Sequence, residues 1–310
     1  MIHLRILAPA DLADRVLAQL SEQPTVVSLA HVRGAATKPA GDLILCEVPR
    51  ENASVVIEGL RELGVDKTGS ISLEAVEGHL SEAGRRAVEE APGSPSDAVV
   101  WDEVEERTSE SAELSGSFLA FMVIATLIAG VGILNDSQVL IIGAMVVGPE
   151  FGPLAGICVA LVSRSPALAR RSLVALAAGF PLAIAVTLLA TLAGRSIGIA
   201  PHRVTPVGHP STIFISHPNG FSVVVAILAG VAGMLSLTTA KSGALIGVLI
   251  SVTTIPAAGN VAVATAYRDW NELGGAAEQL VLNLACLIVA GTATLTAQRL
   301  AYRRRLARAA

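Results

Sequence analysis

The carboxylate with the most unusual surroundings in this sequence is Glu150, within the run Gly148-Pro149-Glu150-Phe151-Gly152-Pro153. A membrane span drawn from Gln138 to Val162 has this acid at its middle, and an ionisable side chain at that depth indicates a functional site. The glycines and prolines predict a broken helix with freed backbone carbonyls and N–H groups. With them, Glu150 could coordinate a cation, exchange a proton or balance a helix dipole. The alternative is a protonated acid that is hydrogen-bonded to freed backbone in a packed core.

A second broken segment is predicted about a hundred residues later, at Thr253-Thr254-Ile255-Pro256-Ala257-Ala258-Gly259-Asn260. Its threonines and amide could complete a polar site opposite Glu150, or they could satisfy backbone groups around a kink. Broken helices at corresponding places of two halves predict a binding site at the midplane of a transporter-like fold. The candidate ion- or ligand-binding residues are Gly148, Pro149, Glu150, Gly152, Pro153, Thr253, Thr254, Pro256, Gly259 and Asn260.

The other residues with chemical potential form no catalytic or metal-binding motif. His202, His209 and His217 have spacings that match no short metal-ligand motif, and Cys46, Cys158 and Cys286 are expected to be free thiols. Glycines four residues apart (148, 152 and 156, then 243 and 247) predict close helix packing more than a ligand site. Phosphate-binding loops, zinc-protease helices and nucleophile elbows are absent from the sequence, so we expect no enzymatic activity and assign no cofactor.

The elements that must position these residues follow from composition. Of the 310 residues, 52% are hydrophobic and only 15% are charged, and the mean hydropathy is +0.62. This predicts an integral membrane protein. Residues 1–116 carry a net charge of −11 and residues 117–310 a net charge of +7. The change in charge predicts a soluble domain followed by a membrane domain.

The membrane domain, residues 117–298, is expected to be all-α with about six spans. The expected spans are Ser117–Leu134, Gln138–Val162, Ser172–Leu192, Phe221–Leu237, Gly243–Ala266 and Glu278–Thr296. Three crossings in each of the halves 117–195 and 221–298 would give an inverted 3+3 repeat with two broken helices. Nine Lys or Arg residues fall in the loops and tail on one side and three on the other. The positive-inside rule then predicts cytoplasmic N- and C-termini, with 299–310 as a basic cytoplasmic tail.

The soluble domain, residues 1–80, is expected to be α+β. Alternation and helical periodicity predict the order β-α-β-β-α-β of a ferredoxin-like fold, with strands near 2–6, 26–32, 43–48 and 70–76. Both helices would cover one face of the sheet, and the other could bind a ligand, a second subunit or the membrane domain. Residues 81–116 are expected to be an acidic linker with a short juxtamembrane helix near Trp101.

The run Ile141-Ile142-Gly143-Ala144-Met145-Val146-Val147 that leads into Gly148–Pro153 resembles a known family. With Asn135-Asp136-Ser137 before it, it is similar to the prokaryotic membrane family called domain of unknown function 389. Gly148 and Glu150 depart from the commoner pattern, which has Ser before the first Pro and apolar residues after it. The resemblance implies a multi-pass protein of the prokaryotic inner membrane and supplies no activity.

Two functions follow as hypotheses. The first is a transporter or channel-like protein with a midplane site at the two breaks, regulated by the soluble domain. The second is a membrane-anchored sensor of a small metabolite or nucleotide, or an oligomeric scaffold, without transport. The expected partners are the lipid bilayer, further copies of the chain in a homo-oligomer, and an unknown small ligand or ion; nucleic acid is not expected.

Overall fold

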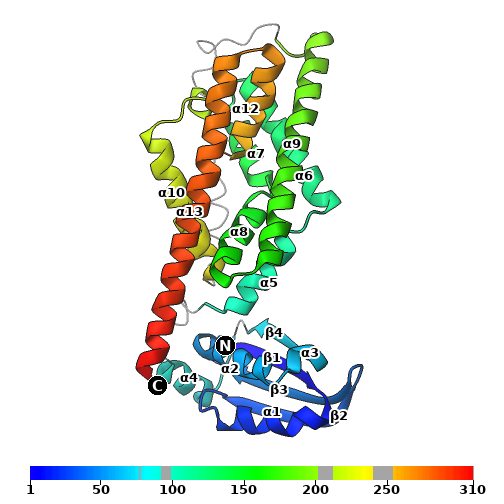
Figure 1. Ribbon diagram of the computed structural model, residues 1–310, viewed down its shortest axis with the longest axis vertical. Coiled ribbons are helices and arrows are strands. Elements are labelled where there is room, and N and C mark those ends of the chain that lie inside the picture. Colours follow the sequence, from blue (N-terminus) through cyan, green and yellow to red (C-terminus); the bar gives the residue numbers. More distant parts are fainter. Residues whose placement is uncertain (77, 92–98, 202–211, 240–253, 310) are drawn as a thin grey trace. The chain divides into compact units, whose positions relative to one another are not determined.

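The computed structural model describes residues 1–76, 78–91, 99–201, 212–239 and 254–309, and its helices and strands are shown in Figure 1. It divides into two compact units. The first comprises Met1–Val104 with short pieces from later in the chain, among them the end of the last helix from Tyr302. The second contains the helices between Glu105 and Ala301.

The first unit is a small antiparallel sheet with helices between its strands. Its elements are β1 (Ile2–Ala8), α1 (Ala10–Glu22), β2 (Ser28–Thr37), β3 (Ala40–Val48), α2 (Arg50–Glu62), the one-turn α3 (Val65–Thr68) and β4 (Ser70–Ala75). The strands lie in the order β2-β3-β1-β4, and every neighbouring pair is antiparallel. The expected α+β domain with a small antiparallel sheet is therefore confirmed.

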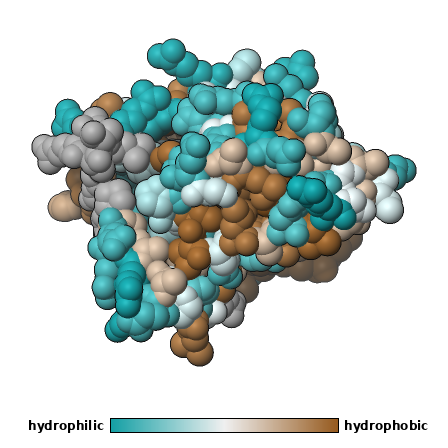
Figure 2. Space-filling view, turned by 90° about the horizontal axis from the view of Figure 1, so that it is seen from below, coloured by the Kyte–Doolittle hydropathy of each residue, from teal (hydrophilic) through white to brown (hydrophobic). Residues whose placement is uncertain are grey.

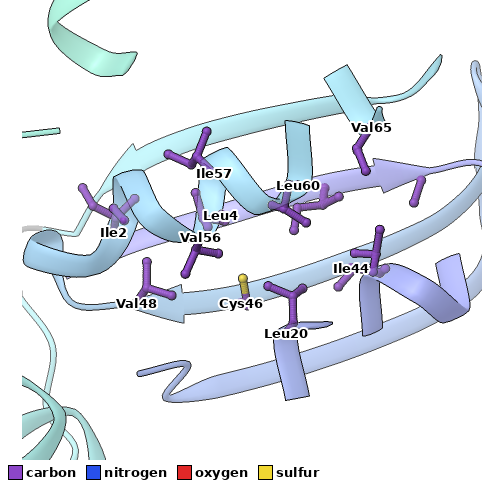
Figure 3. Close-up of a cluster of buried hydrophobic side chains, with 14 of the residues drawn as sticks. Ile2, Leu4, Leu20, Ile44, Cys46, Val48, Val56, Ile57, Leu60 and Val65 are labelled. Carbon is purple, nitrogen blue, oxygen red and sulfur yellow. The ribbon is translucent and has the colours of Figure 1, made fainter. Parts of the chain in front are cut away.

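The core of the first unit lies between one face of the sheet and both long helices, as Figure 3 shows. Alternate residues of β1 and β3 point into it because successive side chains of a strand face opposite sides. These are met by residues at helical spacing on α1 and α2. The buried set includes Ile2, Leu4, Ile6, Ala13, Val16, Leu20, Ile44, Cys46, Val48, Ala53, Val56, Ile57 and Leu60. Cys46 is a free thiol in this core, and burial raises its pKa to about 12.

The opposite face of the sheet is only partly covered. His3 pairs with Glu47 across β1 and β3, and Glu47 is hydrogen-bonded to Ser28 (2.9 Å) and His79 (3.1 Å). On the same face, Val32 of β2 is 49% exposed. On the side of the molecule drawn in Figure 2, hydrophilic residues surround a group of hydrophobic ones. Along β2 and β3, polar and apolar side chains such as Ser28, Glu47 and Val32 share the sheet face that the helices leave open.

The acidic segment after the sheet contains two helices, α4 (Glu82–Glu90) and α5 (Trp101–Ser111). The start of α5 is fastened to α2 within the first unit. Glu103 forms a 2.9 Å ion pair with Arg50, and Asp102 forms another with Arg61. The expected short helix near Trp101 is therefore present, and it begins as part of the sheet unit.

The second unit is helical. Its elements are α6 (Gly116–Leu134), α7 (Gln138–Val147), α8 (Phe151–Ser163), α9 (Pro166–Ser196), the short η3 (Ile213–Ile215), α10 (Gly220–Thr238), α12 (Thr254–Tyr267) and α13 (Trp270–Ala309). Within the described ranges, four helices (α6, α9, α10 and α13) are long and apolar enough to cross a membrane. The pair α7 and α8, bent by 51°, is either a fifth, broken span or a re-entrant loop. Of the expected span Gly243–Ala266, only the part from Thr254 is described.

Small residues bring these helices into close contact. A Cβ added to Gly259 of α12 would lie 2.9 Å from Cβ of Ala129 on α6, and one added to Gly230 of α10 would lie 2.9 Å from Cβ of Ala290 on α13. Leu154 of α8 packs with residues of α10 and α13. Helices in lipid associate through such close backbone approach. The four long apolar helices are those of a membrane protein.

Candidate functional site

The helix break predicted around Glu150 is present, between α7 and α8. α7 ends at Val147, whereas Gly148 has extended backbone (φ −64°, ψ 129°), which a residue before proline favours. Pro149 has no N–H to continue the helical hydrogen bonds. Glu150 returns to helical backbone, and α8 follows from Phe151 with Pro153 in its first turn, where a missing N–H is tolerated.

Glu150 is buried at this break and joins it to the start of α12. The side chain is 4% exposed, and its Oε1 accepts a 2.6 Å hydrogen bond from the hydroxyl of Thr254. Its Oε2 has no hydrogen-bond partner among the described residues. Residues 104 positions apart in the sequence thus form a buried polar contact, and one carboxyl oxygen remains for another partner.

Gly148 allows the two segments to approach. A Cβ at this position would lie 2.6 Å from Cγ1 of Ile255 and still closer to the Glu150 carboxylate. Distances below 3.0 Å are not tolerated without movement. Since the φ of Gly148 suits any residue, the requirement for glycine comes from this contact alone. The structure therefore brings together three of the sequence-predicted site residues, Gly148, Glu150 and Thr254.

The second predicted break is described only from Thr254 onward. Thr254–Tyr267 is continuous helix, so Ile255–Asn260 forms the first turns of α12 and contains no interruption. Pro256 is the third residue of this helix, where its missing N–H costs little because first-turn N–H groups have no intrahelical acceptor. The predicted site residue Thr253 lies outside the described residues.

The other two candidates on α12 do not contact Glu150 by any described bond. Gly259 packs against α6, as described above. The side-chain amide of Asn260 donates a 3.4 Å hydrogen bond to Glu272, which lies in the first turn of α13. Gly259 therefore interacts with α6 and Asn260 with α13.

The glycines after the break are packing residues. A Cβ at Gly152 would lie 2.6 Å from the carbonyl oxygen of Ser111, at the end of α5, and one at Gly156 would meet the side chain of Ser172 on α9. This agrees with the packing interpretation of the four-residue spacing. Gly243 and Gly247 lie outside the described residues, as do His202 and His209. Across the described part of the chain, no group of three or more His, Cys, Asp and Glu residues could hold a metal ion.

Two arginines that the sequence did not single out bind the ends of the helices that start at the site. The guanidinium of Arg195, on α9, donates to the carbonyl of Ala266 near the end of α12. The guanidinium of Arg299, on α13, donates to the carbonyl of Val162 near the end of α8. A cation at a helix C-terminus stabilises the helix dipole. The constant spacing of 104 residues, from 195 to 299 and from 162 to 266, is a sequence signal that could have found them.

Comparison with known proteins matches the region that contains this site. Residues 145–289 match the family model described as "Domain of unknown function (DUF389)". An uncharacterized protein of Methanocaldococcus jannaschii, MJ0678, is 27% identical over 168 residues, which are 54% of this chain and 50% of that protein. The chain therefore spans about half the length of that curated relative. No solved structure matches the chain. The matched region contains Glu150, Thr254 and all of α12, so the part of the chain that holds the site is similar to the family of domains of unknown function 389.

Proposed function

We propose that the helical unit is a transporter or channel-like protein of the membrane, with its site where α8 and α12 begin. The observation that carries the proposal is the buried pair Glu150 and Thr254, with one carboxyl oxygen unmet among the described residues. An ionisable residue inside a membrane bundle marks an ion or substrate pathway more often than a structural contact. The helix starts beside it are the usual sites of ion coordination in transporters with broken helices.

Helix bounds that recur with an offset of 104 residues support this reading. α6 and α10 both begin and end 104 residues apart, at 116 and 220 and at 134 and 238. α8 and α12 end 104 residues apart, at 163 and 267, and α9 and α13 begin at 166 and 270. The connections agree as well, because Arg164 and Arg268 have left-handed backbone with φ of 59° and 58°. This correspondence extends the predicted 3+3 repeat to the level of single residues.

The tertiary contacts follow the same offset. Arg195 reaches α12 and Arg299 reaches α8 through hydrogen bonds at equivalent positions. A Cβ at Gly130 would meet Thr187, and one at Gly291 would meet Met234; these two pairs, 130 with 187 and 234 with 291, also differ by 104. α12 of the second half thus contacts α9 of the first half, and α8 of the first half contacts α13 of the second half. Such exchange is expected when two repeats share one site.

The proposed repeat also supports a position for the site. Glu150 and Thr254 are equivalent positions of the two halves, and they are hydrogen-bonded to each other. Two equivalent positions can touch only on the axis that relates the halves. For halves of opposite orientation, this axis lies in the membrane plane near its middle. We therefore place the pair at the midplane, in a six-span arrangement with cytoplasmic termini and homo-oligomeric assembly.

The soluble unit fits a regulatory role. Its strand order and its β-α-β-β-α-β succession support a ferredoxin-like fold. α5 begins in this unit, bound to α2, and the end of α5 packs against Gly152 within the helical unit. We propose that a ligand of the first unit regulates transport.

The test is flux through the full-length protein in proteoliposomes over a broad panel of ions and small solutes. Glu150→Gln should change the rate of at least one solute while the circular dichroism spectrum is retained. Glu272→Gln, which alters a carboxylate bound to Asn260, is the matched control and should leave that rate unchanged. Equal rates for all three proteins across the panel would contradict the proposal.

A sensor without transport is the second candidate. The observation that favours it is the open sheet face, where Glu47 is hydrogen-bonded to Ser28 and His79 and lies 4.0 Å from the ring of His3. A metabolite or nucleotide that binds this face should raise the melting temperature of the full-length protein through mass action. Glu47→Ala should remove that rise. A panel that stabilises neither protein would count against the sensor.

A further inference from the structure

The exposed face of α9 has the length of a membrane's hydrocarbon core. Five large apolar side chains of this helix are each at least 41% exposed: Leu173, Val174, Leu182, Leu189 and Leu192. From Leu173 to Leu192 the helix rises by about 29 Å, which matches a hydrocarbon core of about 30 Å. The exposed side chains that come just before Leu173 therefore lie at the level of the lipid headgroups.

Four arginines lie at this end of α8 and α9. Arg164 follows the last residue of α8, and Arg170 and Arg171 lie in the second turn of α9. The guanidinium of Arg171 donates to a serine hydroxyl of α5 (2.9 Å), and that of Arg299 donates to a carbonyl at the end of α8. Arg164 and Arg170 are exposed and form no hydrogen bond or ion pair with the described residues. The protein thus holds two of the four arginines and leaves two available to a partner.

Among the described residues, no carboxylate is paired with these two arginines. The sequence contains no Asp or Glu in residues 151–268. Glu106 and Glu110 of α5 are exposed, and neither forms a described ion pair with them. The corresponding end of α12 differs, because Arg268 is followed directly by Asp269. Positive charge is therefore concentrated where α8 joins α9 and is partly balanced at the equivalent place in the second half.

A phosphate group fits exposed guanidinium groups at the headgroup level. The planar N–H donors of arginine match two oxygens of one phosphate. Large apolar side chains lie within one turn of the arginines, namely Leu161 on α8 (55% exposed) and Leu173 on α9 (56% exposed). These can contact acyl chains, whereas a soluble phosphate would use the charge alone. The surface as a whole therefore fits a lipid with a negative headgroup.

We propose that Arg164 and Arg170 bind the headgroup phosphate of an anionic phospholipid whose acyl chains lie along the exposed face of α9. A zwitterionic lipid binds here more weakly, because a cation in its headgroup balances the phosphate. The interaction does not depend on transport, since it uses the outer surface of the helical unit and not the site at Glu150.

The first test is native mass spectrometry of the full-length protein in detergent, with equal amounts of dioleoyl-phosphatidylglycerol and dioleoyl-phosphatidylcholine. The wild type should retain phosphatidylglycerol preferentially. An arginine near an anionic membrane surface contributes about fivefold in affinity, so Arg164→Gln combined with Arg170→Gln should reduce the preference by up to about 25-fold. Arg268→Gln replaces an exposed arginine with the same left-handed backbone as Arg164 and should keep the preference. Equal retention of both lipids by the wild type, or an unchanged preference in the double variant, would overturn the proposal.

The second test separates the lipid from soluble phosphate. Phosphatidylglycerol in mixed micelles should raise the melting temperature of the full-length wild type by about 5 °C at a hundredfold excess over Kd. Inorganic phosphate at the same concentration should not. Arg164→Lys combined with Arg170→Lys should keep part of the rise, because lysine retains the charge but not the paired donors. An equal rise with inorganic phosphate would indicate a soluble anion as the ligand and would contradict the proposal, as would a full rise in the double glutamine variant.

Discussion

Gly148→Ala tests the contact that joins the two halves of the site. The added Cβ would lie 2.6 Å from Cγ1 of Ile255, a carbon next to the branch point that cannot move away as a flexible side-chain end can. Because Gly148 has an ordinary φ of −64°, alanine causes no backbone strain there. Any loss of stability must then come from crowding against Ile255 of α12 and against the Glu150 carboxylate, which would lie still closer to the added Cβ.

The expected size follows from packing. Overfilling a well-packed interior costs about 1–3 kcal/mol, which corresponds to a fall in melting temperature of about 2–12 °C for a unit of this size. Ile255→Ala removes Cγ1 and alone should cost about 2–5 kcal/mol by opening a cavity. In the double variant the added methyl group enters that space. The combined loss should therefore be smaller than the sum by about 1–2 kcal/mol.

The assay is thermal unfolding of the full-length protein in detergent, followed by circular dichroism at the helix band. Gly143→Ala is the matched control, because a Cβ at Gly143 of α7 would have nothing within 4 Å. This change should be neutral or stabilising by up to about 1 kcal/mol, since alanine favours helix more than glycine. If Gly148→Ala behaves like Gly143→Ala, or if the losses in the double variant simply add, the close contact with Ile255 is refuted.

Three further predictions concern other contacts. Thr254→Val removes the hydroxyl that donates to the buried Glu150; it should cost about 1–3 kcal/mol in unfolding experiments, whereas Thr254→Ser should retain most of the stability. Arg195→Met and Arg299→Met each remove a hydrogen bond to a carbonyl near the end of α12 or α8; each should lower stability by about 1–2 kcal/mol, and a double variant that falls short of the sum would argue against two separate caps. In the sheet unit, the Gly34 N–H (2.8 Å) and the His31 ring (2.7 Å) hold the pKa of Asp42 below its ordinary value of 3.8. Its stabilising effect should be complete above that value and be lost as pH falls through the lowered pKa, so an acid titration of Asp42→Asn should show less dependence on pH, and unchanged dependence would contradict this role.

Local patterns predicted the elements but not the contacts between them. Alternation in β1 and the break at Gly148–Pro153 could be found because each depends on neighbouring residues. α9 and α13 are longer than their apolar centres because a helix continues wherever its own hydrogen bonds are satisfied, in lipid or out of it. Pro256 predicted an interruption, whereas the described helix continues through it from Thr254 to Tyr267.

The sequence predicted a group of polar residues opposite Glu150, namely Thr253, Thr254 and Asn260, but not which of them is its hydrogen-bond partner. Thr254 lies 104 residues away, and hydrophobic periodicity carries no information on such pairing. The common offset of the helix boundaries does carry information on this pairing. Few residues, however, are identical between the halves. The sequence predicted a repeat from the placement of glycines and prolines, and the ends of the helices give its offset of 104 residues.

The hydrogen bond between Glu150 and Thr254 also has an evolutionary consequence. If the halves descend from one duplicated ancestor, these two positions once held the same residue. Each copy of that residue then faced the other copy across the axis. Two glutamates there would place like charges in contact, and two threonines would leave no carboxylate. The unlike pair of acceptor and donor therefore had to arise by a change in at least one copy. Related sequences should consequently vary at 150 and 254 together, with the residue accepted at one position depending on the residue present at the other.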